Sequence, residues 1–418
     1  MSAAPPKLQS GIMAAKQQAV RLNAKEREAA AQASAPVAGA AFKGLLAVLV
    51  LAGIAAFAAG LSGGRADRVW QAYLVNLLVW LGIAQGGVIL SAAFYLTQGR
   101  WAGSTQFRLA EAFAGFIPLG FILFWGLYPA RTVIFPWVLH PIPQKAAYLN
   151  TPFLFARDGI GLLAMTVLSL ALVRISRRSD AIAWQRNPSD IEMPPRAARR
   201  LAPALGILFV VVYSILAVDL VMSLSPQWHS TLFGWYFFAG AFWSAVVAIA
   251  LTAVVLRSRL GARNVFRNPR VLHDLGKLVF AFSIFWMYLV FAQYIVIWYG
   301  DIPVETFFIV RRFYYMPWKA ISYAVVLLMW AAPFVVLLGV RPKKTPAILG
   351  TVAFGGIIGV WLERYLLVVP SLSPHTVPLG WIELLMTLGF FGAFMLCALP
   401  GLNLVAQSAI SEWEEVHE

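Results

Sequence analysis

The chain has 418 residues, of which 60% are hydrophobic and 12% charged, and it contains 16 tryptophans and a single cysteine. Soluble domains carry about 25% charged residues, so this composition excludes an ordinary soluble fold and indicates a polytopic membrane protein. The formal net charge of +15 comes from Lys and Arg in alternate loops between apolar runs. This is the positive-inside pattern of membrane proteins, and it gives no reason to expect a nucleic-acid partner.

Residues 1–41 are polar and rich in Ala, Gln and Lys, and the stretch from Ile12 to Ala33 favours a helix. They do not have the form of a signal peptide, because the apolar region begins too late. We expect a cytoplasmic N-terminal arm. A helix docked on a partner or on the membrane surface is the alternative.

Ten apolar stretches follow, each long enough to cross about 30 Å of hydrocarbon. The predicted spans are 42–62, 69–98, 107–129, 152–175, 200–224, 230–257, 272–299, 316–340, 346–369 and 379–400. The predicted fold is all-α, with a transmembrane domain over 42–400 and an acidic cytoplasmic tail over 401–418.

The basic residues orient these spans. With the N-terminus in the cytoplasm, the inner segments hold 23 of the 33 Lys and Arg, the outer segments hold seven, and three lie within spans. This bias predicts cytoplasmic positions for both termini and an even number of spans. The outer connections 130–151 and 300–316 combine aromatic, charged and proline residues, which indicates ordered surface structure. An aromatic belt at the outer boundary explains Trp137, Trp228, Trp298, Trp318 and Trp381.

Six acidic residues fall inside the predicted spans, where a carboxylate costs several kcal/mol and usually marks a proton, ion or substrate route. Helix direction converts sequence position into depth. It predicts an inner group of Glu111, Asp274 and Lys277 and an outer group of Asp158, Asp219, Glu363, Arg364 and Glu383, with His229 just beyond Asp219. The apolar segments between them suggest two half-channels separated by a dry middle, as in a proton pathway.

Structural explanations compete with this interpretation. Asp274 and Lys277 are spaced for an i, i+3 ion pair. The neighbours Glu363 and Arg364 point in divergent directions and are expected to pair across helices, as are Arg157 and Asp158. Glu383 lies close enough to the interface to snorkel. Asp219 has no base nearby in the sequence.

Cofactor ligands are scarce. Cys397 alone forms no internal disulfide and holds no iron–sulfur cluster, and there is no CxxCH motif for haem attachment. The five histidines lie in loops, at helix ends or in the tail, away from the bundle interior in which a membrane haem is ligated. We therefore expect this chain to bind no metal or haem.

Several segments resemble the NrfD-like membrane subunits of quinol oxidoreductases. They are WQAYLVNLLVWLGIAQGGVILSA (70–92), IFPWVLHPIPQKAAYLN (134–150), PFLFARDGIG (152–161), HDLGKLVFAFSIFWMYLVFAQYIVIWYGDIPVET (273–306) and RRFYY (311–315). The likeness is greatest to the ActF-type subunits of bacterial alternative complex III. It implies two four-helix bundles, over about 69–224 and 230–369, and two peripheral helices.

The resemblance also implies a setting in the bacterial cytoplasmic membrane. The expected partners are an NrfD-like quinol-binding paralogue, an iron–sulfur subunit and c-type cytochrome subunits, which would carry the clusters and haem. For this chain we favour a proton pathway coupled to quinol oxidation in the paralogue. Three alternatives stay open: a quinone site using His140, Asp158 and Asp219, a purely structural anchor, and a proton-coupled secondary transporter. Whether the chain itself takes part in catalysis is also open.

Overall fold

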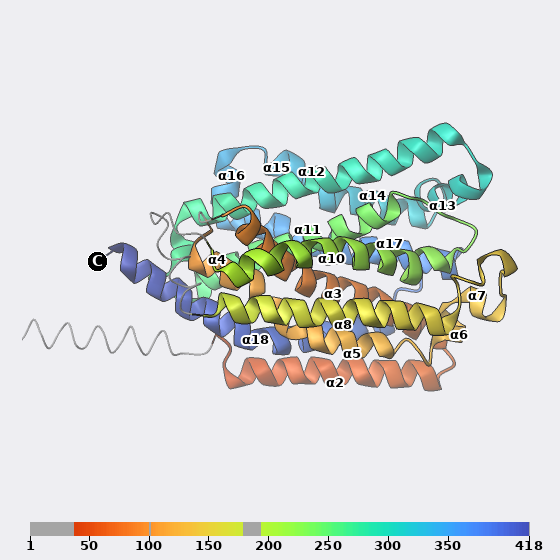
Figure 1. The fold of residues 1–418 in the computed structure, drawn as a ribbon, viewed down its shortest axis with the longest axis horizontal. Coiled ribbons are helices and arrows are strands. Elements are labelled where there is room, and N and C mark those ends of the chain that lie inside the picture. Colours follow the sequence, from red (N-terminus) through yellow and green to blue (C-terminus); the bar gives the residue numbers. More distant parts are fainter. Residues whose placement is uncertain (1–36, 100–101, 179–193, 418) are drawn as a thin grey trace, which may run out of the picture.

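The computed structural model describes residues 37–99, 102–178 and 194–417. The regular elements in these ranges are all helices, and ten stretches are long and apolar enough to cross a membrane. The long helices run side by side along one axis (Figure 1). The expected all-α polytopic fold is confirmed, and the protein is a multi-pass membrane protein. Most of the predicted N-terminal arm, residues 1–36, lies outside the described residues.

The first bundle contains the second to fifth spans. They are α3 (Ala66–Leu96), the interrupted span α4–η2–α5 (Gly103–Glu111, Ala112–Phe116, Ile117–Trp125), α8 (Thr151–Ser176), and α10 (Arg196–Leu220) with the short turn η4 (Met222–Leu224). The interrupted span tightens into a 3-10 turn at 112–116 and resumes as an α-helix with Pro118 in its first turn. Proline is tolerated there because the first N–H groups of a helix have no internal partner.

The second bundle contains the sixth to ninth spans. They are α11 (Phe233–Arg259), α12 (Pro269–Gly300), the span α14–η6–α15 (Trp318–Val326, Leu327–Ala331, Ala332–Val336) and α17 (Pro346–Leu372). Element η6 is a π-helical turn just before Pro333, and irregular turns of this kind relieve the clash that proline causes inside a helix. The short elements η5 (Val265–Arg267) and α16 (Val340–Lys344) connect spans at one end.

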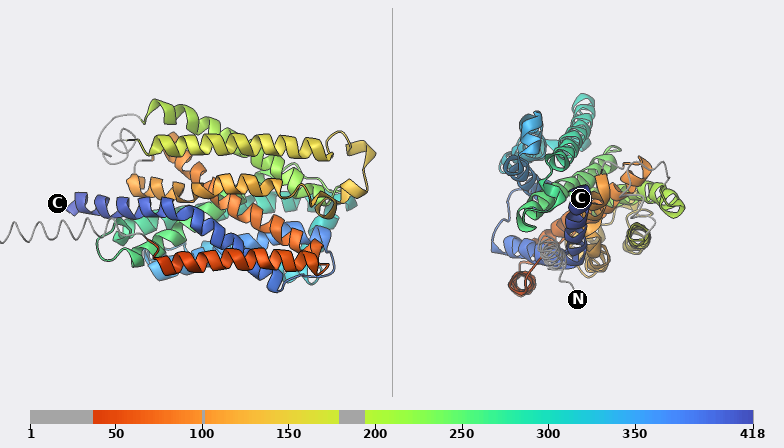
Figure 2. Two further views of the ribbon diagram at one scale, coloured as in Figure 1. Left: turned by 90° about the horizontal axis from the view of Figure 1, so that it is seen from below. Right: turned by 90° about the vertical axis from the view of Figure 1, so that its left-hand side faces the viewer.

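Helices α3 and α11 pack against each other and join the two bundles. They are the most deeply buried spans, which explains why their sequences carry so few exposed polar residues. Helices α2 (Ala40–Ser62) and α18 (Trp381–His417) pair with each other outside the bundles. A Cβ atom on Gly53 would lie 2.7 Å from the Cα of Gly389, so glycine permits the close backbone approach that small residues allow between membrane helices. The end-on view in Figure 2 shows α2 and α12 at opposite edges of the molecule.

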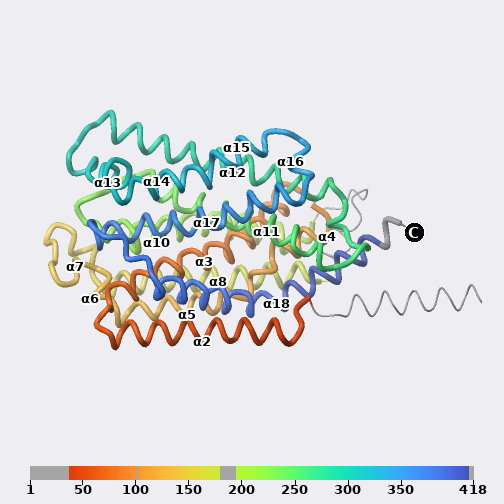
Figure 3. Tube along the Cα trace, turned by 180° about the vertical axis from the view of Figure 1, so that it is seen from behind, coloured from red at the N-terminus to blue at the C-terminus, as the bar shows by residue number. Residues whose placement is uncertain are grey.

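Helix α18 extends beyond the predicted end of the last span at 400 and continues to His417. The residues predicted to form an acidic tail are therefore helical up to His417, and they lie at the end of the molecule at which α2 begins (Figure 3). The carboxylate of Glu412 accepts hydrogen bonds from Ser104 Oγ at 3.0 Å, Thr105 N–H at 3.0 Å and Thr105 Oγ1 at 2.6 Å. This acid caps the start of α4, whose first N–H groups have no partner within the helix.

The outer connections are ordered, as expected. Residues 130–150 form the short helices α6 (Arg131–Ile134) and α7 (Pro136–Leu139) and the turn η3 (Pro143–Lys145), and 303–313 form α13 (Pro303–Phe313). The predicted aromatic belt is wrong for Trp137, Trp228 and Trp318, which are buried. These side chains are covered because the connections fold back over the bundle, where Trp228 stacks on Phe308 with ring centroids 3.7 Å apart.

Candidate functional site

The end of the first bundle that the basic residues predict to face outward, called the outer end below, contains a tight ion pair between α8 and α10. Arg157 donates from Nε to Asp219 Oδ2 at 2.5 Å and from its terminal nitrogen to Oδ1 at 2.6 Å. Asp219 is fully buried and Arg157 nearly so. Arg157 thus pairs across helices as predicted, and Asp219, which has no base nearby in the sequence, receives its counterion from another helix. The bidentate geometry fixes both side chains.

Asp158 lies beside this pair without a counterion of its own. It is 1% exposed, and neither carboxylate oxygen has a hydrogen-bond partner among the described residues. Its nearest charged neighbours are Asp219 and Arg157, which already satisfy each other. Burial without a counterion favours the neutral form of a carboxyl group. Asp158 is therefore suited to take up and release a proton.

Tyr148 of the outer connection covers the pair. The guanidinium of Arg157 lies 3.7 Å from the centroid of the Tyr148 ring and donates to the Tyr148 carbonyl at 3.1 Å. Partial burial and the nearby Asp219 carboxylate raise the pKa of Tyr148 to about 12. The connection itself is tied down by Lys145, whose Nζ donates to the Pro226 carbonyl at 2.6 Å. Tyr148 was not a predicted site residue, because its position over Arg157 depends on the path of the loop.

The inner end of the first bundle holds Glu111. It is 3% exposed, and Ser91 Oγ donates to its carboxylate at 2.6 Å. Ser176, Arg108 and Arg177 are further polar neighbours of this carboxylate. The carboxylate has no ion pair in the described part of the chain. On the neighbouring α8, the buried hydroxyl of Ser176 has no hydrogen-bond partner there either. Glu111 therefore remains a buried acid without a fixed counterion.

A polar contact also lies between these two ends, where the sequence predicted a dry middle. Gln85 of α3 donates from Nε2 to Ser169 Oγ of α8 at 2.5 Å, and both residues are buried. Asp158, Ser169 and Ser176 are separated by 11 and 7 residues, close to three and two helical turns. They therefore share the inward face of α8. This spacing is visible in the sequence, but uncharged hydroxyl groups are common in membrane helices and do not stand out there as the acids do.

The buried acid of the second bundle, Glu363, has two partners of its own. Glu363 accepts a short hydrogen bond from the Tyr236 hydroxyl, and its other oxygen lies 3.3 Å from the Arg364 guanidinium. The prediction that these neighbours pair across helices is therefore wrong for Glu363. The long Arg364 side chain folds back beside it, donates to the Phe237 carbonyl at 3.0 Å, and occupies space left by Gly240.

The remaining predicted residues do not join these clusters. Glu383 is buried in an ion pair with Arg68 at 2.7 Å, so it does not snorkel. Asp274 and Lys277 form the i, i+3 pair at 2.7 Å, but their side chains are 24% and 56% exposed. His229 lies 3.5 Å from Glu305 on the outer surface.

His140 is exposed, and its imidazole makes no hydrogen bond with the described residues. The predicted two layers are therefore not two clusters. Three of the outer acids, Asp219, Glu363 and Glu383, lie in separate ion pairs, and Asp158 lies beside one of these pairs without a counterion. Glu111 is the only predicted inner residue that is buried.

Within the described ranges, no group of three or more His, Cys, Asp and Glu side chains is arranged to hold a metal ion. A scan against protein-family models matches no family, and a search of curated proteins finds no match for this chain.

Proposed function

We propose that this chain conducts protons through its first bundle as the membrane subunit of a quinol-oxidising complex. The observation that carries the proposal is the placement of two buried acids without counterions, Asp158 and Glu111, at opposite ends of one bundle. A buried acid without a counterion is costly in a membrane and seldom occurs without a function.

The inward face of α8 supplies the path between them. Asp158 and Ser176 are 18 residues apart, about 27 Å at 1.5 Å per residue, close to the thickness of the hydrocarbon layer. The Gln85–Ser169 contact divides this distance into a step of about 16.5 Å from Asp158 to Ser169 and one of about 10.5 Å from Ser169 to Ser176. Water molecules are required to bridge both steps, and hydroxyl and amide groups are suitable anchors for them.

The ion pair next to Asp158 leaves that residue as the group that exchanges a proton at this end of the bundle. Arg157 neutralises Asp219, so one positive and one negative charge are held in place while Asp158 exchanges its proton. Protonated Asp158 leaves this site neutral, and its ionised form adds a negative charge beside Arg157. The energy difference between the two states depends on hydration at the outer end, beneath Tyr148. Quinol oxidation in a partner subunit would release protons on this side.

The second bundle is less suited to conduction. Glu363 is held by both Tyr236 and Arg364, so its carboxyl group is fixed in place by two partners and is not free to exchange a proton along a chain of water molecules. We therefore assign the proton route to the first bundle and a structural role to the Glu363 cluster.

Proton translocation by the intact complex in proteoliposomes tests the assignment. Asp158→Asn and Glu111→Gln should each lower the proton-to-electron ratio while quinol oxidation continues in the presence of an uncoupler. Asp274→Asn, in a partly exposed ion pair at the inner surface, is the matched control and should leave the ratio unchanged. Unaltered ratios in both test variants would leave only an anchoring role.

The quinol-oxidising setting is supported by the resemblance to NrfD-like subunits of the segments 70–92, 134–150, 152–161, 273–306 and 311–315. The proposed location is the bacterial cytoplasmic membrane, beside an NrfD-like paralogue, an iron–sulfur subunit and c-type cytochromes. Purification in mild detergent tests this setting. The chain should elute together with haem-containing partners, whereas a secondary transporter would elute alone.

A further inference from the structure

A strongly basic surface covers the inner end of the first bundle, at the opposite end from the Arg157–Asp219 pair. Helix α8 ends there and α10 begins there, and the two helices pack against each other at one edge of the molecule (Figure 2). Six arginines with exposed side chains lie at these helix ends and are called the arginine patch below. They are Arg174, Arg177 and Arg178 at the end of α8, and Arg196, Arg199 and Arg200 at the start of α10.

The arginine patch has no partner in the part of the chain that the structure describes. None of its six guanidinium groups forms an ion pair or a hydrogen bond with those residues. The acids at the same end of the molecule are engaged elsewhere, since Asp274 pairs with Lys277 and Glu412 caps α4. Glu111 is a neighbour of Arg177, but it is buried. The described chain therefore offers the arginine patch no free carboxylate.

Membrane orientation requires positive charge at the inner surface, but it does not require that this charge lack partners. The inner connection of the second bundle shows the difference. Arg257 donates to the carbonyls of Phe266 and Arg267 at 2.9 Å. Arg263 lies 5.9 Å from the centroid of the Trp413 ring. Orientation alone therefore does not account for the arginine patch.

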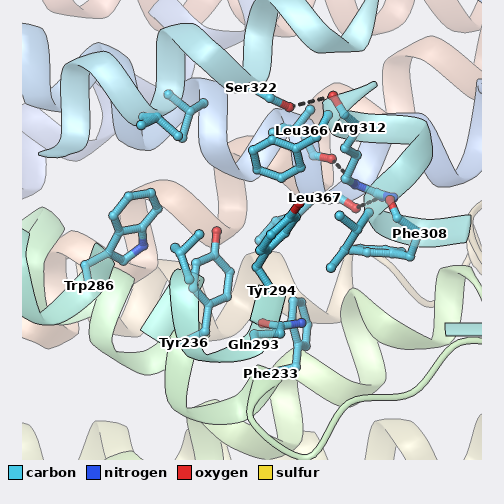
Figure 4. A pocket seen from close by; sticks show the side chains of 15 residues that line it. Phe233, Tyr236, Trp286, Gln293, Tyr294, Phe308, Arg312, Ser322, Leu366 and Leu367 are labelled. Carbon is cyan, nitrogen blue, oxygen red and sulfur yellow. Dashed lines mark hydrogen bonds between the residues drawn. The ribbon is translucent and has the colours of Figure 1, made fainter. Parts of the chain in front are cut away.

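The buried cation of the second bundle gives the same contrast. Figure 4 shows Arg312 hydrogen-bonded to oxygen atoms of the chain, among them the carbonyls of Phe308 at 3.0 Å and Leu366 at 2.8 Å. A guanidinium group carries five N–H donors. For the arginine patch, acceptors for these donors have to come from the inner membrane surface, where the phosphate groups of lipids lie.

Part of the arginine patch surrounds a hollow that has room for phosphate groups. The hollow measures about 330 Å³, and the described residues that line it are Arg196, Arg199 and Arg200. One water molecule takes up about 30 Å³ in the liquid, so a hydrated phosphate fits. Cations at the start of a helix lie at the positive end of its dipole and do not stabilise it. Guanidinium groups bind phosphate through paired hydrogen bonds, and this chemistry gives the three arginines a role.

An apolar stripe leads from the arginine patch along the lipid-facing side of each helix. Exposed apolar side chains follow one another at intervals of three, four or seven residues. They are Ile160, Leu163, Val167 and Leu170 on α8, and Ile207 and Val211 on α10. The same spacing leads on from Leu170 to Arg174 and Arg177, and back from Ile207 to Arg200, so each stripe ends in arginine. A molecule with an anionic head and apolar tails therefore matches both the charge and the surface of these helices.

We propose that the inner ends of α8 and α10 bind an anionic phospholipid with two phosphate groups, the cardiolipin type. Each helix supplies three arginines, so each phosphate has its own group of cations, and the acyl chains lie along the two stripes. A lipid with one phosphate satisfies one helix only. A zwitterionic lipid brings a cation of its own into the arginine patch. The inference depends on the membrane location of the chain and not on the proton route or on quinol-oxidising partners.

Binding of added cardiolipin to the purified chain tests the proposal. The full-length chain, with any subunits that remain bound, is stripped of lipid in detergent, and native mass spectrometry follows a cardiolipin titration. A triple variant with Arg196→Gln, Arg199→Gln and Arg200→Gln should bind cardiolipin about 10- to 100-fold more weakly, because each basic residue near an anionic lipid surface contributes roughly fivefold.

The matched control removes the same charge from the same face of the membrane at another place. A triple variant with Arg259→Gln, Arg263→Gln and Arg270→Gln changes three exposed arginines of the inner connection in the second bundle. It should bind cardiolipin as the wild type does. Equal weakening in the two triple variants would reject a defined site, because it would mean that the lipid responds only to the total charge of the inner surface.

Three competitors identify the occupant. Phosphatidylglycerol, which has one phosphate, should bind about 10-fold more weakly than cardiolipin, and phosphatidylcholine should not compete. Pyrophosphate carries two phosphates without acyl chains and should not displace cardiolipin at millimolar concentration. Equally tight binding of phosphatidylglycerol would refute the two-phosphate site. Displacement by pyrophosphate would show a site for soluble anions instead of a lipid.

Heat stability in detergent shows whether both triple variants are folded. If the first one is not, the single variant Arg199→Gln takes its place, with an expected weakening of roughly fivefold, and unchanged binding in this variant would contradict the proposal. Lipid binding is measured without turnover. Failure here therefore leaves the Asp158 and Glu111 results standing, and the reverse also holds.

Discussion

Arg312 donates its Nε–H to the carbonyl oxygen of Leu366 at 2.8 Å, and this is the carbonyl that Pro370 leaves without a helical partner. Proline has no N–H to return to the residue four positions earlier. A second nitrogen of Arg312 donates to the Leu367 carbonyl at 3.0 Å. Burial, with a contribution from the neighbouring Arg311, lowers the pKa of Arg312 well below its ordinary value. This buried cation is thus held by carbonyl groups in place of a carboxylate.

Arg312→Gln should destabilise the protein by about 2–4 kcal/mol, because several hydrogen bonds from a charged donor are lost at once. The cost should be smaller in a Pro370→Ala background, since alanine restores the N–H that serves Leu366. Thermal unfolding of the wild type, the two single variants and the double variant measures how far the stability losses of the two substitutions depend on each other. Arg311→Gln, at the more exposed neighbour, is the control. Equal losses in both backgrounds would show that Arg312 does not compensate for the proline.

The Arg157–Asp219 pair should respond unequally to the removal of its two partners. Arg157→Gln leaves two buried carboxyl groups without a cation, and we expect a loss of about 3–5 kcal/mol. Asp219→Asn leaves the guanidinium beside Asp158, which can replace the missing anion, so the loss should be smaller by about 1–2 kcal/mol. Thermal unfolding of both variants measures the difference. A larger loss in Asp219→Asn would contradict the proximity of Asp158 to Arg157.

Glu412 should hold the start of α4 in place. Glu412→Ala removes the acceptor used by Ser104 and Thr105 and should cost about 0.5–2 kcal/mol, as for other caps. Hydrogen exchange of the amides in 103–108 should become faster. Glu412→Gln keeps one oxygen acceptor and should show an intermediate rate. Unchanged exchange in the alanine variant would mean that the end of α18 does not contribute to the order of α4.

Tyr148 should titrate late and loosen the outer connection when it does. Its pKa is raised to about 12 by partial burial and by the Asp219 carboxylate, against an ordinary value of about 10. A raised pKa means that the fold favours the neutral phenol, so this contribution to stability is complete below about pH 10 and is lost as the pH rises towards 12. The difference in absorbance at 295 nm between wild type and Tyr148→Phe follows the titration. A midpoint near 10 would show that Tyr148 is not packed against Asp219.

The spans were predictable because hydropathy and helix length are local properties of the chain. All ten were located to within a few residues except at the last, where the sequence suggested a tail and the structure continues α18 to His417. The acids were also identified from the sequence, because an ionisable group in an apolar run is conspicuous.

The partner of each charge was decided only by the tertiary structure. Asp158 directly follows an arginine in the sequence and Asp219 has no base nearby, yet Asp219 receives the bidentate counterion and Asp158 receives none. The sequence places Glu383 near the interface, but in the structure it is buried in an ion pair with Arg68 of another helix. The rotation of each helix about its axis and the folding of the outer connections set these contacts. Both depend on packing between residues far apart in the sequence, which no local pattern encodes.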